Sequence, residues 1–439
     1  MTSTAYKQYK NTNHAWIEAT PAHWKTGRVK DFVETNAAVK VPADLAEDDL
    51  VEFVPMTNVN DELGQITEFN FVPYKDVASG YTKFKNKDVI FAKITPCMEN
   101  GNSAVVTGLS KNIGFGSTEF IVFRAKPKLN EKFLHYFFHN ELFLRNAEPF
   151  MKGTAGQKRI SSQFMATHFF VFPPFNEQIA IVNYLDSKTK QLDTNINFLT
   201  KKAKAYEKLK QSLINEAVTR GLDKTLAMKD SGIEWIGDVP NHWQIQRIGT
   251  AFEERSEKVN DTDYPPLSVS MGGIVPQMDS VAKTEHNENR KRVAVGDYVI
   301  NSRSDRRGAS GISIYNGSVS VINIVLKPKK KFYGKYLHHL FRSYQFIEEF
   351  YRNGRGIVDD LWTTRYAVMK TIEFAFPEYA EQKEIADYLD EKTVKIEQIV
   401  DTINLQIEKL KELRKTLIND VVTGKIKVTQ DEEGEGLAA

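Results

Sequence analysis

The chain has 439 residues, of which 41% are hydrophobic and 26% are charged, so its composition is that of a globular protein and not of a disordered one. Its net charge of +2 is too small to indicate nucleic-acid binding by itself. One cysteine, Cys97, excludes an internal disulfide framework and a cysteine-based zinc cluster, and no long apolar run predicts a membrane span or a secretion signal. We therefore expect a cytoplasmic protein with two domains.

Residues 1–172 are predicted to form a first mixed α/β domain. Apolar runs bounded by turn residues predict strands over 87–94 and 118–125, and an amphipathic pattern predicts a helix over 131–151. A Gly-containing basic loop, KGTAGQKRI (152–160), follows this helix. Residues 173–222 are predicted to be a long helix that begins just after the prolines of FPPF (172–175), because proline is tolerated near a helix start.

Residues 223–376 are predicted to form a second α/β domain of the same kind. Strands are expected over 296–302 and 319–328, a helix over 334–353, and a Gly-rich loop, NGRGIVDDL, over 353–361. Basic residues are concentrated in the loop-like stretch 289–308. A second long helix is predicted over 377–428, and residues 429–439 read as an acidic flexible tail.

The two halves of the chain repeat each other. Residues 172–219 and 376–423 share sixteen identities in 48 positions, and AWIEATPAHW (15–24) corresponds to EWIGDVPNHW (234–243). A repeat of this length means two copies of one domain and not a solenoid. Between these anchors the halves diverge, so we expect similar frameworks that carry different loops.

Both long helices carry an apolar heptad seam in the same register. Its members are Leu192, Ile196, Leu199, Ala203, Tyr206, Leu213 and Ala217 in one helix and Ile396, Val400, Ile403, Ile407, Leu410, Leu417 and Val421 in the other. An amphipathic helix packed on its own domain is the alternative, but the shared register favours antiparallel pairing. Lys210 and Arg414 interrupt the seams at equivalent positions and are expected to direct their charges outward.

The sequence contains no recognisable catalytic machinery. No Gly-rich cofactor loop or Walker loop is present, and the nine histidines follow no metal-ligand spacing. His23 and His242 both precede a tryptophan of the repeat and are interpreted as structural. We therefore do not expect this chain to be an enzyme by itself.

Several phrases resemble the DNA-specificity subunits of Type I restriction–modification systems. They are SGIEWIGDVPNHW (231–243), FAKITPCMENGN (91–102), GSTEFIVFRA (116–125) and the EQ…YLD openings of both long helices. In the second half, NSRSDRRGAS replaces AKITPCMENG, so transfer of residue roles is safer for the first domain.

This resemblance implies two tandem-duplicated α/β target-recognition domains separated by two long antiparallel coiled-coil helices. Each domain would read one half of a bipartite asymmetric site in double-stranded DNA. The helices would dock two methyltransferase subunits, and the complex would recruit restriction/translocase subunits. No cofactor is expected on this chain, whereas S-adenosylmethionine, ATP and Mg are expected on the partner subunits.

The residues predicted to bind DNA lie in polar loops, because Arg pairs with guanine, Asn or Gln pairs with adenine, and basic groups contact phosphate. They are Lys93, Thr95, Glu99, Asn100, Gln157, Lys158 and Arg159 in the first domain and Ser302, Arg303, Ser304, Arg306, Arg307, Asn353 and Arg355 in the second. Glu177, Gln178, Glu381 and Gln382, at the helix starts, are predicted to bind partner subunits.

The alternative function is a two-domain DNA-binding or regulatory adaptor that works without methyltransferases. The target bases and the spacer length between the half-sites do not follow from the sequence.

Overall fold

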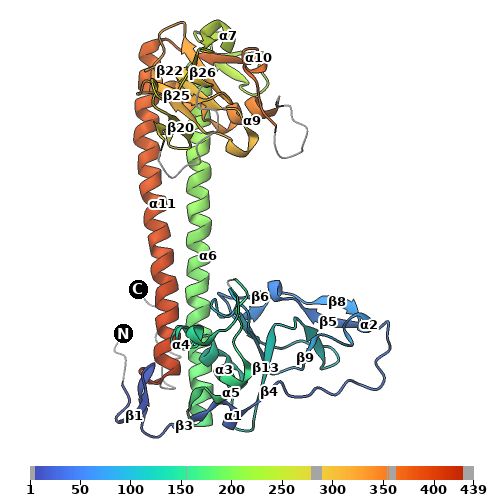
Figure 1. Cartoon of the computed structure of the whole chain (residues 1–439). Helices are drawn as coiled ribbons and strands as arrows, with labels where there is room; N and C mark the ends of the chain where they lie inside the picture. The colour runs from blue at the N-terminus through green and yellow to red at the C-terminus, as the bar shows by residue number, and fades with distance from the viewer. Residues whose placement is uncertain (1–4, 155, 278–288, 353, 355–361, 429–439) are drawn as a thin grey trace. The chain divides into compact units, whose positions relative to one another are not determined.

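A computed structural model describes residues 5–154, 156–277, 289–352, 354 and 362–428 (Figure 1). The predicted acidic tail lies outside these residues. The chain forms two compact units: unit 1 comprises 1–198 and 406–439, and unit 2 comprises 199–405. The two long helices, α6 (Phe175–Arg220) and α11 (Tyr379–Val422), each contribute one segment to each unit and lie inside the two ranges predicted to be helical.

Unit 1 is a mixed α/β structure. Its strands are β1 (Tyr9–His14), β2 (Ile17–Pro21), β3 (Lys25–Arg28), β4 (Val33–Thr35), β5 (Leu50–Val54), β6 (Val59–Asn60), β7 (Gln65–Ile66), β8 (Asn70–Pro73), β9 (Thr82–Phe84), β10 (Asp88–Ala92), β11 (Ser103–Val105), β12 (Gly114–Gly116), β13 (Phe120–Ala125) and β14 (Phe169–Phe172). Its short helices are α1 (Val29–Phe32), α2 (Tyr74–Val77), α3 (Glu131–Phe138), α4 (Glu141–Ala147) and α5 (Ser162–Thr167), with 3-10 turns η1 (Met56–Asn58) and η2 (Glu148–Phe150).

Unit 2 is built in the same way. Its strands are β15 (Met228–Asp230), β16 (Asp238–Pro240), β17 (Gln244–Arg247), β18 (Phe252–Glu254), β19 (Lys258–Val259), β20 (Leu267–Ser270), β21 (Gly273–Pro276), β22 (Arg290–Val293), β23 (Tyr298–Asn301), β24 (Ser310–Ile312), β25 (Gly317–Ser320), β26 (Asn323–Pro328) and β27 (Glu373–Phe376). Its short helices are α7 (Ile248–Ala251), α8 (Gly334–Phe341), α9 (Tyr344–Arg352) and α10 (Tyr366–Met369), with the 3-10 turn η3 (Ser304–Arg306).

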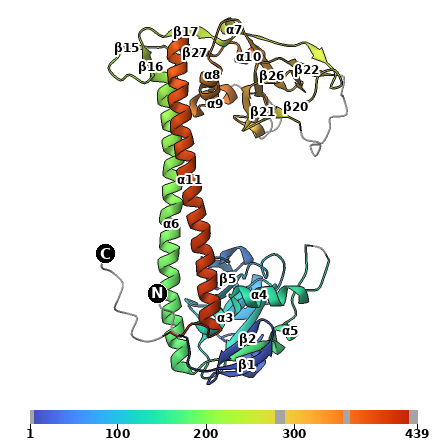
Figure 2. The same ribbon diagram turned by 90° about the vertical axis from the view of Figure 1, so that its left-hand side faces the viewer.

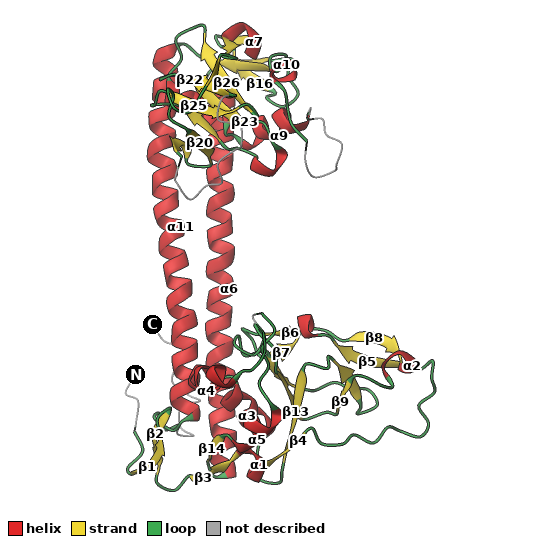
Figure 3. Cartoon of the chain, viewed as in Figure 1, coloured by secondary structure: helices red, strands yellow, loops and turns green. Residues whose placement is uncertain are grey.

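The central sheets extend the sequence repeat into the divergent region. The sheet order is β11-β10-β13-β4 in unit 1 and β24-β23-β26-β18 in unit 2, and these strands correspond one to one in chain order. In unit 1, α3 packs on β10, β11 and β13, and a second sheet, β8-β5-β12-β9, lies next to α2 (Figure 3). In unit 2, β15, β16, β17 and β27 lie around the end of α6 and the start of α11 (Figure 2). The expected fold class is therefore confirmed.

Three sequence expectations about element boundaries are wrong. The helix expected over 131–151 is interrupted because the Asn140 side chain accepts a hydrogen bond from the Phe143 amide and starts α4. Ser343 separates α8 from α9 in the same way. The strand expected over 319–328 is two strands, β25 and β26, separated by a turn.

The two long helices run antiparallel within each unit. In unit 1, Ile181 and Leu185 of α6 share a core with Ile418 and Val422 of α11. In unit 2, the core contains Ala217 and Val218 of α6 together with Ile385 and Leu389 of α11. The seam residues Ile396, Val400, Ile403 and Ile407 are all buried, as the heptad pattern predicts.

The two basic residues in the seams form ion pairs between the helices; the Lys210 pair is exposed, as expected of a charge directed outward, whereas the buried Arg414 contradicts that expectation. Lys210 Nζ lies 2.8 Å from Glu397 in unit 2. Arg414 Nε lies 3.1 Å from Asp193 in unit 1, with its side chain only 11% exposed. These pairs are equivalent in the repeat, but the pair in unit 1 is much more buried. Burial raises the pKa of the Asp193 carboxyl, and Arg414 opposes this effect.

This difference in burial predicts different effects of equivalent substitutions. Arg414→Met should destabilise unit 1 by about 3 kcal/mol, because it leaves a partly buried carboxylate without its counter-charge. The matched Lys210→Met should destabilise unit 2 by less than about 1 kcal/mol, since its partner Glu397 remains hydrated. Hydrogen–deuterium exchange of peptides from both long helices would measure the two effects. Equal destabilisation by the two substitutions would contradict the conclusion that the more buried pair contributes more to stability.

Candidate nucleic-acid interface

The candidate residues of unit 1 come from two segments that form one edge. The Thr95 amide donates to the Lys158 carbonyl (3.0 Å), and the Lys158 amide donates to Thr95 Oγ1 (3.1 Å). The Ile160 amide donates to the Lys93 carbonyl at 2.9 Å. The loop after β10 and the Gly-containing loop before α5 are therefore joined by backbone hydrogen bonds, although about sixty residues separate them in the sequence. We call this region the unit 1 edge (93–102 and 152–160).

Four of the predicted side chains on the unit 1 edge are exposed and unpaired within the described residues. They are Glu99, Asn100, Gln157 and Lys158. The other predicted side chains are already engaged: Lys93 Nζ donates to the Thr118 carbonyl, and Arg159 makes a bidentate pair with Glu119 at 2.8–2.9 Å. The hydrogen bonds from Arg159 lower the pKa of the Glu119 carboxyl. Sequence reasoning missed Glu119, because no local pattern links it to Arg159.

Two stacked histidines, one in α3 and one at its C-cap, form hydrogen bonds with the loop that carries Glu99 and Asn100. The rings of His135 and His139 lie 5.4 Å apart. Since carbonyl oxygens only accept, His135 Nε2 donates to the Ser103 carbonyl (3.2 Å) and His139 Nδ1 donates to the Gly101 carbonyl (3.1 Å). Gly101 has φ +79°, and a Cβ there would lie 2.9 Å from a Leu144 methyl group, so glycine is favoured at this position.

Burial keeps both histidines neutral. It lowers the pKa of His135 to about 3 and that of His139 to about 4; the nearby Arg414 acts in the same direction on both rings, and His139 adds to the effect on His135. A folded state with depressed histidine pKa values binds fewer protons than the unfolded state, so the stability of unit 1 is greatest above the ordinary histidine pKa of 6.5 and decreases as the pH falls below it.

We expect the stability of unit 1 to decrease by about 1.4 kcal/mol per histidine for each pH unit below 6.5. Replacing both His135 and His139 by Asn should flatten this dependence, and the remaining slope should come from groups such as His168, whose pKa burial also lowers. Hydrogen–deuterium exchange of unit 1 peptides between pH 7.5 and 5 would measure the slope. A double variant with an unchanged slope would rule out these histidines as its source.

Unit 2 has an equivalent edge. The Ser304 amide donates to the Trp362 carbonyl (3.0 Å), and the Thr364 amide donates to the Ser302 carbonyl (3.1 Å). Arg303 and Thr363 form an antiparallel bridge, as Ile94 and Arg159 do in unit 1. We call this region the unit 2 edge (301–307 and 362–364).

The side chains of the unit 2 edge that were predicted to bind DNA differ in how far they are already bonded within the unit. Ser302 is buried and its hydroxyl donates to the Ile322 carbonyl, so a base contact would require that bond to break. Arg303 is paired with Asp305, and Arg307 with Glu348 at 2.7 Å. Arg306 is 68% exposed and lies 3.9 Å from Asp305, which makes it more accessible than Arg303 and Arg307. Asn353 and Arg355 lie outside the described residues.

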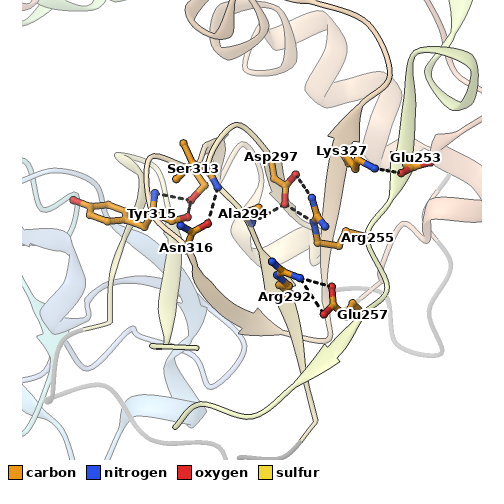
Figure 4. A network of polar contacts seen from close by, with 11 residues as sticks. Glu253, Arg255, Glu257, Arg292, Ala294, Asp297, Ser313, Tyr315, Asn316 and Lys327 are labelled. Atoms are coloured by element: carbon orange, nitrogen blue, oxygen red, sulfur yellow. Dashed lines mark hydrogen bonds and ion pairs between the residues drawn. The ribbon is translucent and has the colours of Figure 1, made fainter. Parts of the chain in front are cut away.

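Much of the basic stretch 289–308 is neutralised inside unit 2. Lys291 pairs with Glu254 at 2.8 Å. Arg292 pairs with Glu257 at 3.0 Å, and the buried Asp297 of the stretch pairs at 2.7 Å with Arg255, which lies outside it (Figure 4). Arg290 is buried and donates to Ser318 at 2.8 Å. The concentration of positive charge in the sequence therefore supports the framework more than it creates a free cationic surface.

The residues predicted to bind partners are engaged within their own units. Glu177 accepts hydrogen bonds from Trp24 Nε1 (2.9 Å) and His23 Nε2 (2.6 Å), which explains why the His-Trp pair repeats. Glu381 accepts from Trp243 (3.0 Å) and His242 (2.7 Å) in the same way.

The adjacent glutamines are completely or almost completely buried. Gln178 accepts from the Asn130 amide (2.7 Å) and donates to the Pro173 carbonyl (2.8 Å). Gln382 makes the same bonds with Tyr333 and Pro377. Contacts of these four residues with partner subunits remain a prediction, and bulky substitutions here would also disturb the unit itself.

Among the described residues, no group of three or more His, Cys, Asp or Glu side chains could hold a metal ion. None of the helices in that part of the chain is long and apolar enough to cross a membrane.

Comparison with known proteins shows what parts of the chain are similar to. Residues 21–204 match the family model of the Type I restriction modification DNA specificity domain. The specificity subunit of the Type I restriction enzyme EcoAI from Escherichia coli is 37% identical over 163 residues, a match that covers 37% of this chain and 27% of that relative.

Other similarities extend over most of the chain. The specificity subunit of the Type I restriction enzyme MjaVIII from Methanocaldococcus jannaschii is 22% identical over 429 residues, which is 93% of this chain and 94% of the relative. A chain from a solved structure concerning the complex assembly and conformational transition of the type I R-M system has a TM-score of 0.73 at 16% identity, and it covers 93% of this chain and 99% of that one. The resemblance to Type I restriction–modification specificity subunits is thus confirmed.

Proposed function

We propose that this chain is a non-catalytic, sequence-specific DNA-binding subunit that reads a bipartite asymmetric site in double-stranded DNA. The observation that carries the proposal is the pair of equivalent edges, each formed where the central strand β10 or β23 ends and joined to the loop that precedes α5 or α10. The unit 1 edge and the unit 2 edge have the same backbone arrangement but carry different side chains. Each edge could therefore recognise a different half of an asymmetric DNA site. The match of residues 21–204 to the specificity domain family supports it.

The unpaired side chains of the unit 1 edge have the chemistry required to read bases. Asn100 and Gln157 can each pair with adenine through the amide, Glu99 can accept a hydrogen bond from the amino group of cytosine, and Lys158 can contact phosphate or guanine. Arg159 is held in place by Glu119, which fixes the direction of its remaining N–H groups. In unit 2, Arg306 is the corresponding accessible group.

We propose that two adenine methyltransferase subunits and restriction/translocase subunits complete the working complex. S-adenosylmethionine, ATP and Mg would then be bound by those subunits and not by this chain. Exposed apolar side chains on the long helices, outside the seam, are suited to such contacts: Phe198 (65% exposed) and Leu413 (52%) in unit 1, Val394 (50%) and Leu405 (56%) in unit 2.

Substitutions on one edge should relax only one half of the DNA site. Asn100→Ala with Gln157→Ala should reduce discrimination at the half-site read by unit 1 by about ten-fold or more, since a bidentate amide–adenine pair contributes about 1–3 kcal/mol. Arg306→Ala should affect only the other half. Sequencing of adenine methylation in a host that carries the complete system would measure both effects.

The control for this experiment is Lys190→Ala, an exposed position of α6 away from the edge. All four of these side chains are exposed, so the variants should fold as the parent does. The proposal that each unit reads its own half-site would be contradicted if one variant reduced discrimination equally at both half-sites. It would also be contradicted by a uniform loss of methylation with unchanged sequence preference.

Substitutions on the long helices should change the number of bound methyltransferases. Phe198→Ser with Leu413→Ser should remove the copy at unit 1, and Val394→Ser with Leu405→Ser the copy at unit 2, because exposed apolar anchors dominate such interfaces. The mass of the purified complex would report the change. Phe71→Ser, at an equally exposed site on β8, is the control. A complex that retains both copies in both variants would refute this docking surface, and a chain that binds DNA without any methyltransferase would support the adaptor alternative.

A further inference from the structure

Three lysines of α6 form an exposed basic face that the proposed function does not use. Successive residues of an α-helix are rotated by about 100°, so Lys201, Lys204 and Lys208 lie within about 60° of one another. The seam residues Ala203 and Tyr206 lie on the opposite side of the helix. All three lysines are exposed, and none has a hydrogen bond or an ion pair within the described part of the chain. We call them the α6 basic face (Lys201, Lys204 and Lys208).

The repeat shows that helix pairing does not require this charge. In the alignment of 172–219 with 376–423, the equivalents of the three lysines in α11 are Leu405, Glu408 and Glu412. Both helices keep the apolar seam, although the opposite face is basic in one helix and acidic or apolar in the other. Glu207, the only acidic residue of α6 between 194 and 215, lies 3.9 Å from the seam residue Lys210. The α6 basic face is therefore specific to the first helix.

Helix α8 runs along the long helices toward the level of this face. The Tyr333 amide, at the N-cap of α8, donates to the Gln382 side chain at 2.9 Å. In the last turn of α8, His339 Nε2 lies 2.8 Å from Asp390. The partner of Lys210 on α11 lies about two turns beyond Asp390. The C-terminal end of α8 therefore points toward the level of Lys210 on α6.

The residue after α8 connects this level with the unit 2 edge. Arg342 donates to the carbonyl of Met271, which lies at the tip of the β20–β21 hairpin. A Cβ on Gly308 would lie 3.4 Å from the Met271 methyl group, so the hairpin reaches the residue that directly follows the 301–307 segment of the unit 2 edge. The α6 basic face thus begins near the level of the unit 2 edge and continues from there toward the start of α6.

The arginines of the unit 2 edge leave little charge for phosphate groups. Arg303 is paired with Asp305, Arg307 is paired with Glu348, and Arg306 is the more exposed one. In protein–DNA complexes, half to two-thirds of the hydrogen bonds go to phosphate and sugar oxygens. Most phosphate contacts beside this edge would therefore have to come from another part of the unit.

We propose that the α6 basic face binds the phosphate backbone of double-stranded DNA next to the half-site read by unit 2. This inference rests on the proposed function. Duplex DNA carries about one negative charge per 1.7 Å of its axis, and the three lysines span about 10 Å of helix. Lysine ammonium groups bind phosphate as point charges, and phosphate contacts carry no sequence information. The face therefore adds affinity to DNA binding without changing the bases that are read.

The salt dependence of DNA binding tests this proposal. The full chain is titrated with a random-sequence duplex of about 30 base pairs at several salt concentrations. The triple variant Lys201→Gln, Lys204→Gln and Lys208→Gln should reduce the slope of log affinity against log salt by about 2.7, because each phosphate contact contributes about 0.9. Between about 50 and 200 mM salt, the parent should then lose about forty-fold more affinity than the variant.

Two further variants separate the charge of this face from other effects. Glutamine has nearly the helix propensity of lysine, and replacing the same three lysines by arginine should restore the parental slope. A charge-matched control is Lys329→Gln, Lys330→Gln and Lys331→Gln, in an exposed segment. This segment follows β26, which pairs at Asn323 with Asn301 and then runs away from the unit 2 edge. The control should keep the parental slope.

An unchanged slope in the Lys201, Lys204 and Lys208 glutamine variant, or an equal decrease in the control, would overturn the proposal. If that variant kept its slope but lost a methyltransferase subunit from the purified complex, the face would be assigned to an acidic protein surface instead. A parent chain that binds no duplex would contradict the proposed function as well. A parent chain that binds, with a variant of unchanged slope, would overturn only the role of the α6 basic face.

Discussion

The side-chain amides of Gln178 and Gln382 are buried at the first turn of α6 and α11, and each accepts a hydrogen bond from the backbone amide just before α3 or α8. A buried amide tolerates few orientations, because each unsatisfied polar atom would destabilise the fold. The adjacent glutamate is bonded to the His-Trp pair, and Asp186 and Asp390, further along the helices, are bonded to Lys132 and Lys335 at 2.6 Å. The direction of each long helix relative to its own sheet, and hence the seam, depends on these bonds.

In the sheets, the two repeats have the same strand order but stabilise it with different side chains. Asp88 is the first residue of β10 and Asp297 directly precedes β23; both are buried and accept a hydrogen bond from the amide three residues earlier. The arginine that neutralises Asp88 is Arg124 on β13, whereas Asp297 is neutralised by Arg255, which follows the edge strand β18. A buried carboxylate requires a counter-charge, but the strand that supplies it is free to change. This freedom explains how the sequences diverged while the sheet order stayed the same.

Periodic and repeated features could be predicted from the sequence, and contacts between distant residues could not. The heptads, the duplication and the central strands β10, β13 and β23 were predicted because they depend on local patterns of apolar residues. The breaks at Asn140 and Ser343 were missed because a polar side chain capped a helix inside an otherwise continuous amphipathic pattern. At the candidate interface, the proximity of Thr95 and Lys158 depends on the whole domain, and the availability of each arginine depends on acids such as Glu119 and Glu348 that no local motif identifies.

The antiparallel helices also determine when each unit can be completed during synthesis. The core of unit 1 contains Ile418, Val421 and Val422, and the Tyr9 hydroxyl donates to the Gly424 carbonyl at 3.2 Å. Unit 1, whose sheets are translated before those of unit 2, therefore lacks part of its core until residues 418–422 have been translated. The core of unit 2 is completed by the first part of α11, which follows the last strand of the unit, β27, directly in the sequence. The order in which the units mature is thus the reverse of the order in which their sheets are made, and the loss of a few C-terminal helical turns would damage the N-terminal unit first.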